Sequence, residues 1–207
     1  MTTETRFAKT ISYLLHPLLM PTYGFALIFF THNYISTFTP PEFKAKILIV
    51  TFFFTFFLPA LNAFILLKIG RIRSMEMETT RERVIPYLST AMYYFALLYM
   101  FYSRNFPMVI VLMIAGAGIS ILLTFFINFK WKISAHAIGI GGLIGGVMGI
   151  SLRLMIDFRL ILLLLILCAG LIGFARLKLK AHEPAQVYTG LLLGFLVELL
   201  LIVFVKF

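Results

Sequence analysis

The chain has 207 residues, of which 61% are hydrophobic and 13% charged, and its mean hydropathy is +1.01. Soluble domains carry about twice this share of charged residues, so too little polar surface exists to cover a globule, and soluble and disordered classes are excluded. The formal net charge is +10. Lysine and arginine lie in short loops between apolar runs, where they set topology and contact lipid headgroups. We therefore expect an integral membrane protein with membrane lipids, and no nucleic acid, as partners.

A helix that crosses a bilayer needs about 20 mostly apolar residues. Seven runs meet this condition, at residues 12–31, 46–68, 86–103, 106–128, 134–152, 159–175 and 186–206. Pro17 and Pro21 interrupt the first run, which predicts either an interfacial or a broken helix and hence six or seven spans. The fold class is thus all-α, a polytopic transmembrane helical bundle that forms a single domain over residues 1–207.

The fifth run is rich in glycine. Gly141 and Gly145, four residues apart, put small side chains on one helix face, so that neighbouring backbones can approach closely. We therefore predict that the fifth helix is central in the bundle.

In the seventh run and the turn before it, polar or small residues recur every four positions. This spacing places them on one helix face. These residues are His182, Gln186, Gly190, Gly194 and Glu198. The glycines predict a groove filled by a neighbouring helix or by an acyl or prenyl chain. Glu198 falls about 18 Å beyond Gln186, so we expect it near the opposite interface, solvated and outside any site.

Several polar residues lie on one side of the membrane at the beginnings and ends of the predicted helices. They are Arg81, Arg83, Ser134, His136, Arg176 and His182. Helix N-termini and arginines bind anions, and histidines attack phosphorus or protonate a leaving oxygen. This set predicts phosphoryl transfer, although an interfacial histidine beside cations also occurs as a plain headgroup contact. His16 and His32 lack such company, and we expect them to be interfacial or structural.

The spacing of these residues resembles the type-2 phosphatidic acid phosphatases, relatives of the vanadium haloperoxidases. The signature S-R-x5-H-x3-D of that family is matched by Ala175-Arg176, then His182 and Gln186. P-S-G-H is matched by Ile133-Ser134-Ala135-His136, and K-x6-R-P is suggested by Arg81-Glu82-Arg83-Val84-Ile85-Pro86. The resemblance covers residues 68–200.

The resemblance implies a role for each matched residue. His182 becomes the nucleophile that forms a phosphohistidine, and His136 becomes the general acid for the leaving lipid alcohol. Arg176, Ser134 and the Ala135 backbone N–H would hold the phosphate oxygens, with Arg81 or Arg83 completing the cradle. No metal or other cofactor is needed, and the expected partner is a phosphorylated lipid substrate.

This chain departs from the family pattern at Gln186, which stands where the family has aspartate. A glutamine carbonyl can fix the histidine tautomer but cannot balance a positive imidazolium. Two functions therefore stay open: a lipid phosphate phosphohydrolase, or a weak or inactive family member that binds or transports a phosphorylated lipid. The substrate class spans phosphatidic acid, phosphatidylglycerophosphate, polyprenyl diphosphates and lipid A phosphates. The sequence indicates no oligomeric state.

A third function, membrane prenyl transfer, would need acidic loops that bind magnesium diphosphate. The acids available on that side are Glu76, Glu78 and Glu82, and we rank this function last.

The distribution of lysine and arginine and the family resemblance predict opposite sides of the membrane for the site. Twelve of the 18 lysines and arginines lie on the side of the N-terminus, which by the positive-inside rule is cytoplasmic. The family resemblance implies a site that faces outward. Without the predicted site cations (Arg81, Arg83, Lys132 and Arg176) the counts are eight and six. We expect a multi-pass protein of the cell membrane, the bacterial inner membrane, with a periplasmic site.

Overall fold

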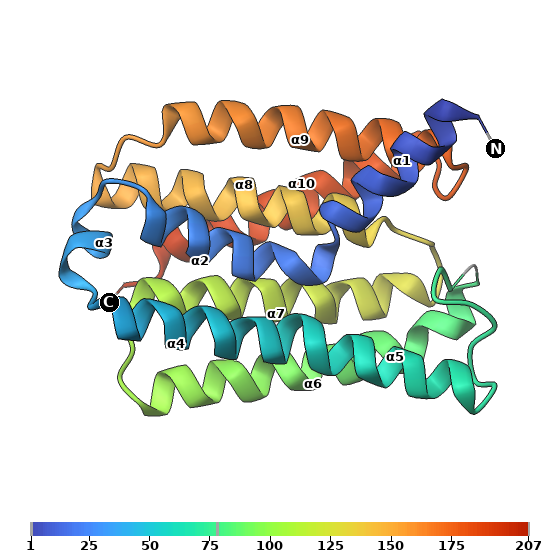
Figure 1. Cartoon of the computed structure of the whole chain (residues 1–207), viewed down its shortest axis with the longest axis horizontal. Helices are drawn as coiled ribbons and strands as arrows, with labels where there is room; N and C mark the ends of the chain where they lie inside the picture. Colours follow the sequence, from blue (N-terminus) through green and yellow to red (C-terminus); the bar gives the residue numbers. More distant parts are fainter. Residues whose placement is uncertain (1, 78, 207) are drawn as a thin grey trace.

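The computed structural model describes residues 2–77 and 79–206, and the regular secondary structure of this part of the chain is helical (Figure 1). In chain order the elements are α1 (Thr3–Leu14), η1 (Pro17–Leu19), α2 (Met20–Phe30), α3 (Tyr34–Phe38), α4 (Pro41–Phe52), η2 (Phe53–Phe57), α5 (Leu58–Lys68), α6 (Thr80–Ser103), α7 (Met108–Asn128), α8 (Ala135–Leu154), α9 (Arg159–Lys178) and α10 (Pro184–Phe204). Seven candidate membrane spans result in the described residues: α1 with α2, α4 with α5, and α6 to α10. The predicted all-α polytopic bundle is confirmed.

The first span is broken where its prolines predict a break. Helix α1 ends at Leu14, and a short 3-10 turn, η1, begins at Pro17. His16 caps this turn, because its Nδ1 accepts a hydrogen bond of 3.3 Å from the Leu18 N–H. Proline cannot donate to the helical ladder, so the chain changes direction here and carries His16 and Pro17 to the wall of an internal cavity.

The second span contains a wider turn that the sequence did not indicate. The π-helical segment η2 joins α4 to α5 and ends just before Pro59. Single π turns inside α-helices accompany functional sites in many proteins. Pro59 and the residues that follow it on α5, Ala60 and Ala63, line the same cavity as His16.

Helices α8 and α10 pack with their backbones in close approach. A Cβ atom added at Gly145 would lie 2.2 Å from the Phe195 carbonyl oxygen, and one added at Gly194 would lie 2.1 Å from the Ile138 carbonyl oxygen. Helix α8 is also the most buried span, with 61% of its most apolar window buried against 50% or less in the other six. The predicted central position of the fifth span is confirmed. The glycine groove of α10 is filled by α8, the helix alternative of the two predicted occupants.

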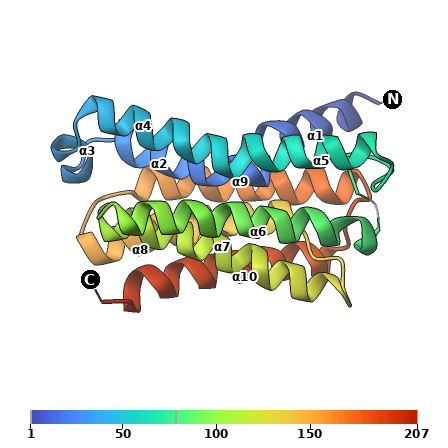
Figure 2. The same cartoon turned by 90° about the horizontal axis from the view of Figure 1, so that it is seen from below.

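The connections alternate between the two ends of the bundle. The N-terminus and the turns at 69–77, 129–134 and 179–183 lie at one end, on the right of Figure 1, and the C-terminus lies with α3 at the other. The view in Figure 2 agrees. Three turns that are distant in sequence therefore meet at the end where the predicted site residues lie.

Candidate functional site

A cavity of about 1040 Å³ lies between the broken first span, α5, α6, α7, α8 and α10. At its outer end, near the N-terminus, it is lined by cations, histidines, hydroxyl groups and one carboxylate, Glu76. Among these residues are Ser12, His16, Arg83, Lys132, His136, Arg176 and His182. Its inner end reaches Glu198 and several hydroxyl side chains. Between the two ends the walls are largely apolar, with Met20, Ile138 and Leu143 among them.

His182 lies in the turn before α10 with one ring nitrogen fixed. Its Nδ1 is 3.0 Å from Gln186 Oε1 and 3.2 Å from the Lys132 carbonyl oxygen. The Glu183 N–H also donates to Gln186 Oε1, at 3.3 Å, which agrees with an oxygen at that position. Oxygen acceptors require a proton on Nδ1. In the neutral ring the lone pair is therefore on Nε2.

The surroundings of His182 favour the neutral ring. The side chain is 8% exposed. Burial lowers the pKa of His182 to about 4, against the opposing hydrogen bond with Gln186, and the positive charges of Arg83, Arg176 and Lys132 lower it further. At neutral pH the ring is uncharged, and its free nitrogen is nucleophilic.

Two arginines reach the cavity from different elements. Arg83, in the first turns of α6, is 6% exposed, and its Nε donates a hydrogen bond of 2.8 Å to the Met77 carbonyl oxygen. Arg176, in the last turn of α9, donates from Nη1 to the Ser12 hydroxyl at 3.4 Å, and its buried Nε has no hydrogen-bond partner. In the described part of the chain no carboxylate lies within ion-pair distance of either guanidinium. Both are therefore suited to an anionic ligand.

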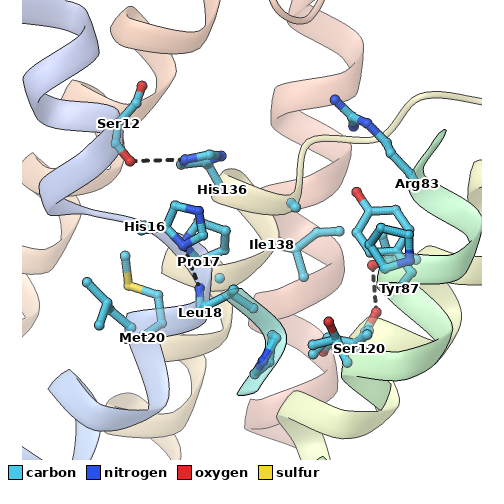
Figure 3. Close-up of a pocket in the computed structure, with 18 of the residues that line it drawn as sticks. Ser12, His16, Pro17, Leu18, Met20, Arg83, Tyr87, Ser120, His136 and Ile138 are labelled. Atoms are coloured by element: carbon cyan, nitrogen blue, oxygen red, sulfur yellow. Dashed lines mark hydrogen bonds between the residues drawn. The ribbon is translucent and has the colours of Figure 1, made fainter. Parts of the chain in front are cut away.

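The rings of His136 and His16 lie next to each other in the cavity wall (Figure 3). His136 Nε2 donates to the Ser12 carbonyl oxygen at 3.1 Å. The ring of His16 lies 5.5 Å from that of His136, edge to face. Because His16 Nδ1 accepts from Leu18, its neutral ring carries the proton on Nε2, a donor. His16 was not among the predicted site residues; the only sequence signal for it is the helix break at Pro17.

The remaining predicted residues have different positions. Ala135 lines the cavity, and Gln186 supports His182 from outside the lining. Ser134 is fully buried as the N-cap of α8: its hydroxyl accepts from the Ala137 N–H at 3.4 Å, and it is absent from the lining. Arg81 is exposed and also absent from the lining. Of the two predicted arginine alternatives, the structure thus places Arg83 in the cavity and leaves Arg81 outside it.

The expectation that Glu198 is solvated near the opposite interface is wrong. The side chain is 5% exposed and lines the same cavity as His182. Glycine at position 116 makes room for it, since a Cβ there would lie 2.5 Å from Glu198 Cδ. Hydropathy indicates how deep a residue lies along a helix, but it does not indicate which helix face contacts a neighbour. The face of α10 that carries Glu198 packs against α7 and α8.

Metal ligands and acidic loops give no clear second site. The described residues include no group of three or more histidine, cysteine, aspartate or glutamate side chains that could hold a metal ion. Of the three acids considered for magnesium diphosphate, Glu76 lines the cavity, and Glu82 accepts hydrogen bonds from the Arg73 and Thr79 N–H groups. Glu78 lies outside the described residues.

No model of a known protein family, no characterised protein and no solved structure matches the chain.

Proposed function

We propose that this multi-pass membrane protein hydrolyses phosphorylated lipids, either phosphate monoesters or diphosphates, with His182 as nucleophile. The observation that carries the proposal is the state of His182: a buried neutral ring, Nδ1–H donated to Gln186 and Lys132, and Nε2 left with its lone pair. Arg83 and Arg176 lie on the same cavity.

The three segments that resemble phosphatase signatures also support the proposal. Arg83, His136 and the pair Arg176 and His182 come from four elements or turns, yet they line one cavity. Alternate crossing brings these residues to one end of the bundle, but it does not by itself put them on the wall of one cavity. Phosphoryl transfer does require cations, a nucleophile and an acid within one site.

In the proposed reaction the lone pair of His182 Nε2 attacks phosphorus. The bond between phosphorus and the bridging oxygen breaks, and that oxygen takes one of the two protons of a cationic His136 ring, which keeps its Nε2–H on the Ser12 carbonyl oxygen. The leaving group departs as the lipid alcohol from a monoester, or as the lipid monophosphate from a diphosphate. Water then attacks phosphorus while the now neutral His136 accepts a proton from it, the bond between phosphorus and His182 Nε2 breaks with its electron pair returning to Nε2, and inorganic phosphate departs. Arg83 and Arg176 neutralise the phosphate oxygens; removal of one such donor typically costs about 10²–10³ in rate.

Gln186 sets the expected speed of this reaction. Its carbonyl holds the His182 tautomer but supplies no negative charge to balance the ring once it has accepted the phosphoryl group. The catalytic triad of the serine proteases shows how large such a role can be, since exchange of its aspartate for asparagine costs about 10⁴ in rate. We therefore propose slow turnover.

Gln186 and the length of the cavity favour one further candidate, a protein that binds or transports a phosphorylated lipid without hydrolysis. Such a protein needs Arg83 and Arg176 but not the nucleophile. It would bind lipid phosphates in an arginine-dependent way, while phosphate release stays at background.

One experiment separates the two functions. Phosphate release by the purified protein is measured without added metal over a panel of lipid phosphates, for the parent, His182→Ala and Gln186→Asp. His32→Ala is the matched control, because His32 lies in the connection between α2 and α3, at the end of the bundle away from the N-terminus, and does not line the cavity. Hydrolysis predicts release that His182→Ala abolishes and His32→Ala preserves. Background release in the parent, together with retained arginine-dependent binding, would favour the transport function.

We also propose that the site faces the periplasm of a bacterial inner membrane. The test is labelling of single cysteines at Lys130 and Lys46 in a Cys168→Ala background, with an impermeant maleimide on intact cells. Both positions are exposed, at opposite ends of the bundle. An outward site predicts labelling at position 130 only, and labelling at position 46 only would place the site in the cytoplasm.

A further inference from the structure

The cavity continues well beyond the arginines and His182. Along α10, Glu198 follows Gln186 by 12 residues, or about 18 Å of helix. A phosphate group spans only a fraction of this length. The inner part of the cavity is therefore available to another part of a ligand.

The inner end is built around the carboxyl group of Glu198. This side chain is 5% exposed, lines the cavity, and its Oε2 has no hydrogen-bond partner. In the described residues no lysine, arginine or histidine forms an ion pair with it. An ionisable group inside a membrane span is costly and is a functional candidate by default.

The neighbouring helices make space for this carboxyl group. A Cβ atom at Gly116 of α7 would lie 2.5 Å from both Glu198 Cδ and Oε2, and one at Gly142 of α8 would lie 3.5 Å from Glu198 Cγ. Any side chain at position 116 would displace the carboxyl group. Glycine at position 116 thus allows the fold to hold an acid in this place.

Hydroxyl groups surround the same end of the cavity. Thr90 and Tyr94 of α6 and Ser120 of α7, one helical turn from Gly116, line the cavity towards this end, and Ser120 is labelled in Figure 3. The Ser120 hydroxyl is buried without a hydrogen-bond partner. Buried polar atoms without partners are expensive in a membrane. A ligand that donates hydrogen bonds would satisfy them.

We infer that Glu198 and these hydroxyls form a second binding site, which takes a hydroxyl or ammonium group on the organic part of the phosphorylated molecule. The inference rests on the proposed function only in assigning the phosphate to the outer end. It narrows the substrate class: a polyol, sugar or amino-alcohol phosphate fits both ends, whereas a simple alkyl or polyprenyl phosphate leaves the inner end unsatisfied.

Chemical labelling tests the site without turnover. Dicyclohexylcarbodiimide adds to protonated carboxyl groups in apolar surroundings and forms a stable acylurea, which peptide mass spectrometry locates. We expect labelling at Glu198 that Glu198→Gln removes and that a lipid-linked sugar phosphate or phosphatidylglycerophosphate reduces at least severalfold. Polyprenyl phosphate and inorganic phosphate should protect much less. Equal protection by all four probes, or by none, would overturn the inference.

Affinity measurements with matched variants provide the second test. The preference for a donor-bearing lipid phosphate over an alkyl phosphate should fall roughly tenfold in Glu198→Leu, the effect expected for one buried hydrogen bond to an ionisable group. Gly116→Ala, which displaces the carboxyl group, should lower the preference as well. Gly118→Ala is the control, because its Cβ would lie 3.6 Å or more from its neighbours. An unchanged preference in both Glu198→Leu and Gly116→Ala would reject the site.

The same variants identify the donor group. Glu198→Gln keeps an acceptor oxygen and should retain the preference for a hydroxyl, but it should lose the preference for an ammonium group. A Glu198-dependent preference without phosphate release would reject hydrolysis and keep this site. Release without that dependence would reject the site and keep hydrolysis.

Discussion

Gln186→Glu should place a carboxylate beside His182, so that a negative charge stabilises the positively charged form of the ring. Glutamate keeps the length of glutamine, so its oxygen can accept the hydrogen bonds from His182 Nδ1, now 3.0 Å away, and from the Glu183 N–H, now 3.3 Å away. The new negative charge lies next to the ring. It should raise the pKa of His182 from about 4 towards its ordinary value.

The magnitude follows from that pKa. Return from about 4 to 6.5 spans about 2.5 pH units, and at about 1.36 kcal/mol for each unit this is roughly 3 kcal/mol of added stabilisation for a positive ring. Coulomb's law with an effective dielectric constant of 20 gives about 4 kcal/mol for unit charges 4 Å apart. If the phosphorylated ring gains the same amount, turnover rises by about 10²-fold.

The assay is the pH profile of phosphate release by the parent and Gln186→Glu. The acidic limb, where His182 becomes protonated and loses its nucleophilic lone pair, should move from near pH 4 up towards pH 6.5, while the rate at neutral pH rises. Ala185→Glu is the control: it adds the same charge to the exposed neighbouring position. An acidic limb that stays in place, with an unchanged neutral rate, would refute the assignment of His182 as nucleophile.

Three further predictions concern the cavity and its scaffold. Arg83→Ala should lower phosphate release by about 10²-fold or more, whereas Arg81→Ala, outside the cavity lining, should leave it near the parent value; equal losses in both would contradict the assignment of Arg83. Gly145→Ala places a Cβ 2.2 Å from a carbonyl oxygen of α10 and should destabilise the fold by about 1–3 kcal/mol in thermal unfolding, while Gly170→Ala, with nothing within 4 Å, should not. Since the pKa of His182 is lowered to about 4 by burial, the unfolded chain binds more protons between pH 6.5 and 4; stability should therefore be complete above pH 6.5 and decrease towards pH 4 by up to about 3 kcal/mol. His182→Gln should remove this component, and an identical pH dependence of unfolding in both proteins would contradict it.

Much of the fold was predictable because it depends on local properties of the chain. The apolar runs reach the length that a bilayer requires, and the structure has seven candidate spans in these places. Pro17 and Pro21 broke the first span as expected, because a missing N–H acts locally. The grouping of loops followed from alternate crossing alone. The π turn before Pro59 had no comparable sequence signal.

The candidate site was predictable in part. Spacing in the sequence singled out Arg176, His182 and His136, and these line one cavity. Spacing could not choose between Arg81 and Arg83, which lie two residues apart on one helix. The family resemblance also predicted that the Ser134 hydroxyl binds a ligand. In the structure this hydroxyl caps α8, and Ser134 does not line the cavity.

The sequence by itself thus determined the class of the protein, its membrane spans, and the presence of arginine and histidine side chains at one end of the bundle. Only the tertiary structure decided which side chains share the cavity. His16 enters it because the first span is interrupted between α1 and α2, and Glu198 enters it because Gly116 on another helix leaves space for the carboxyl group. Both depend on contacts between residues far apart in the chain, and hydropathy and spacing contain no information on such contacts.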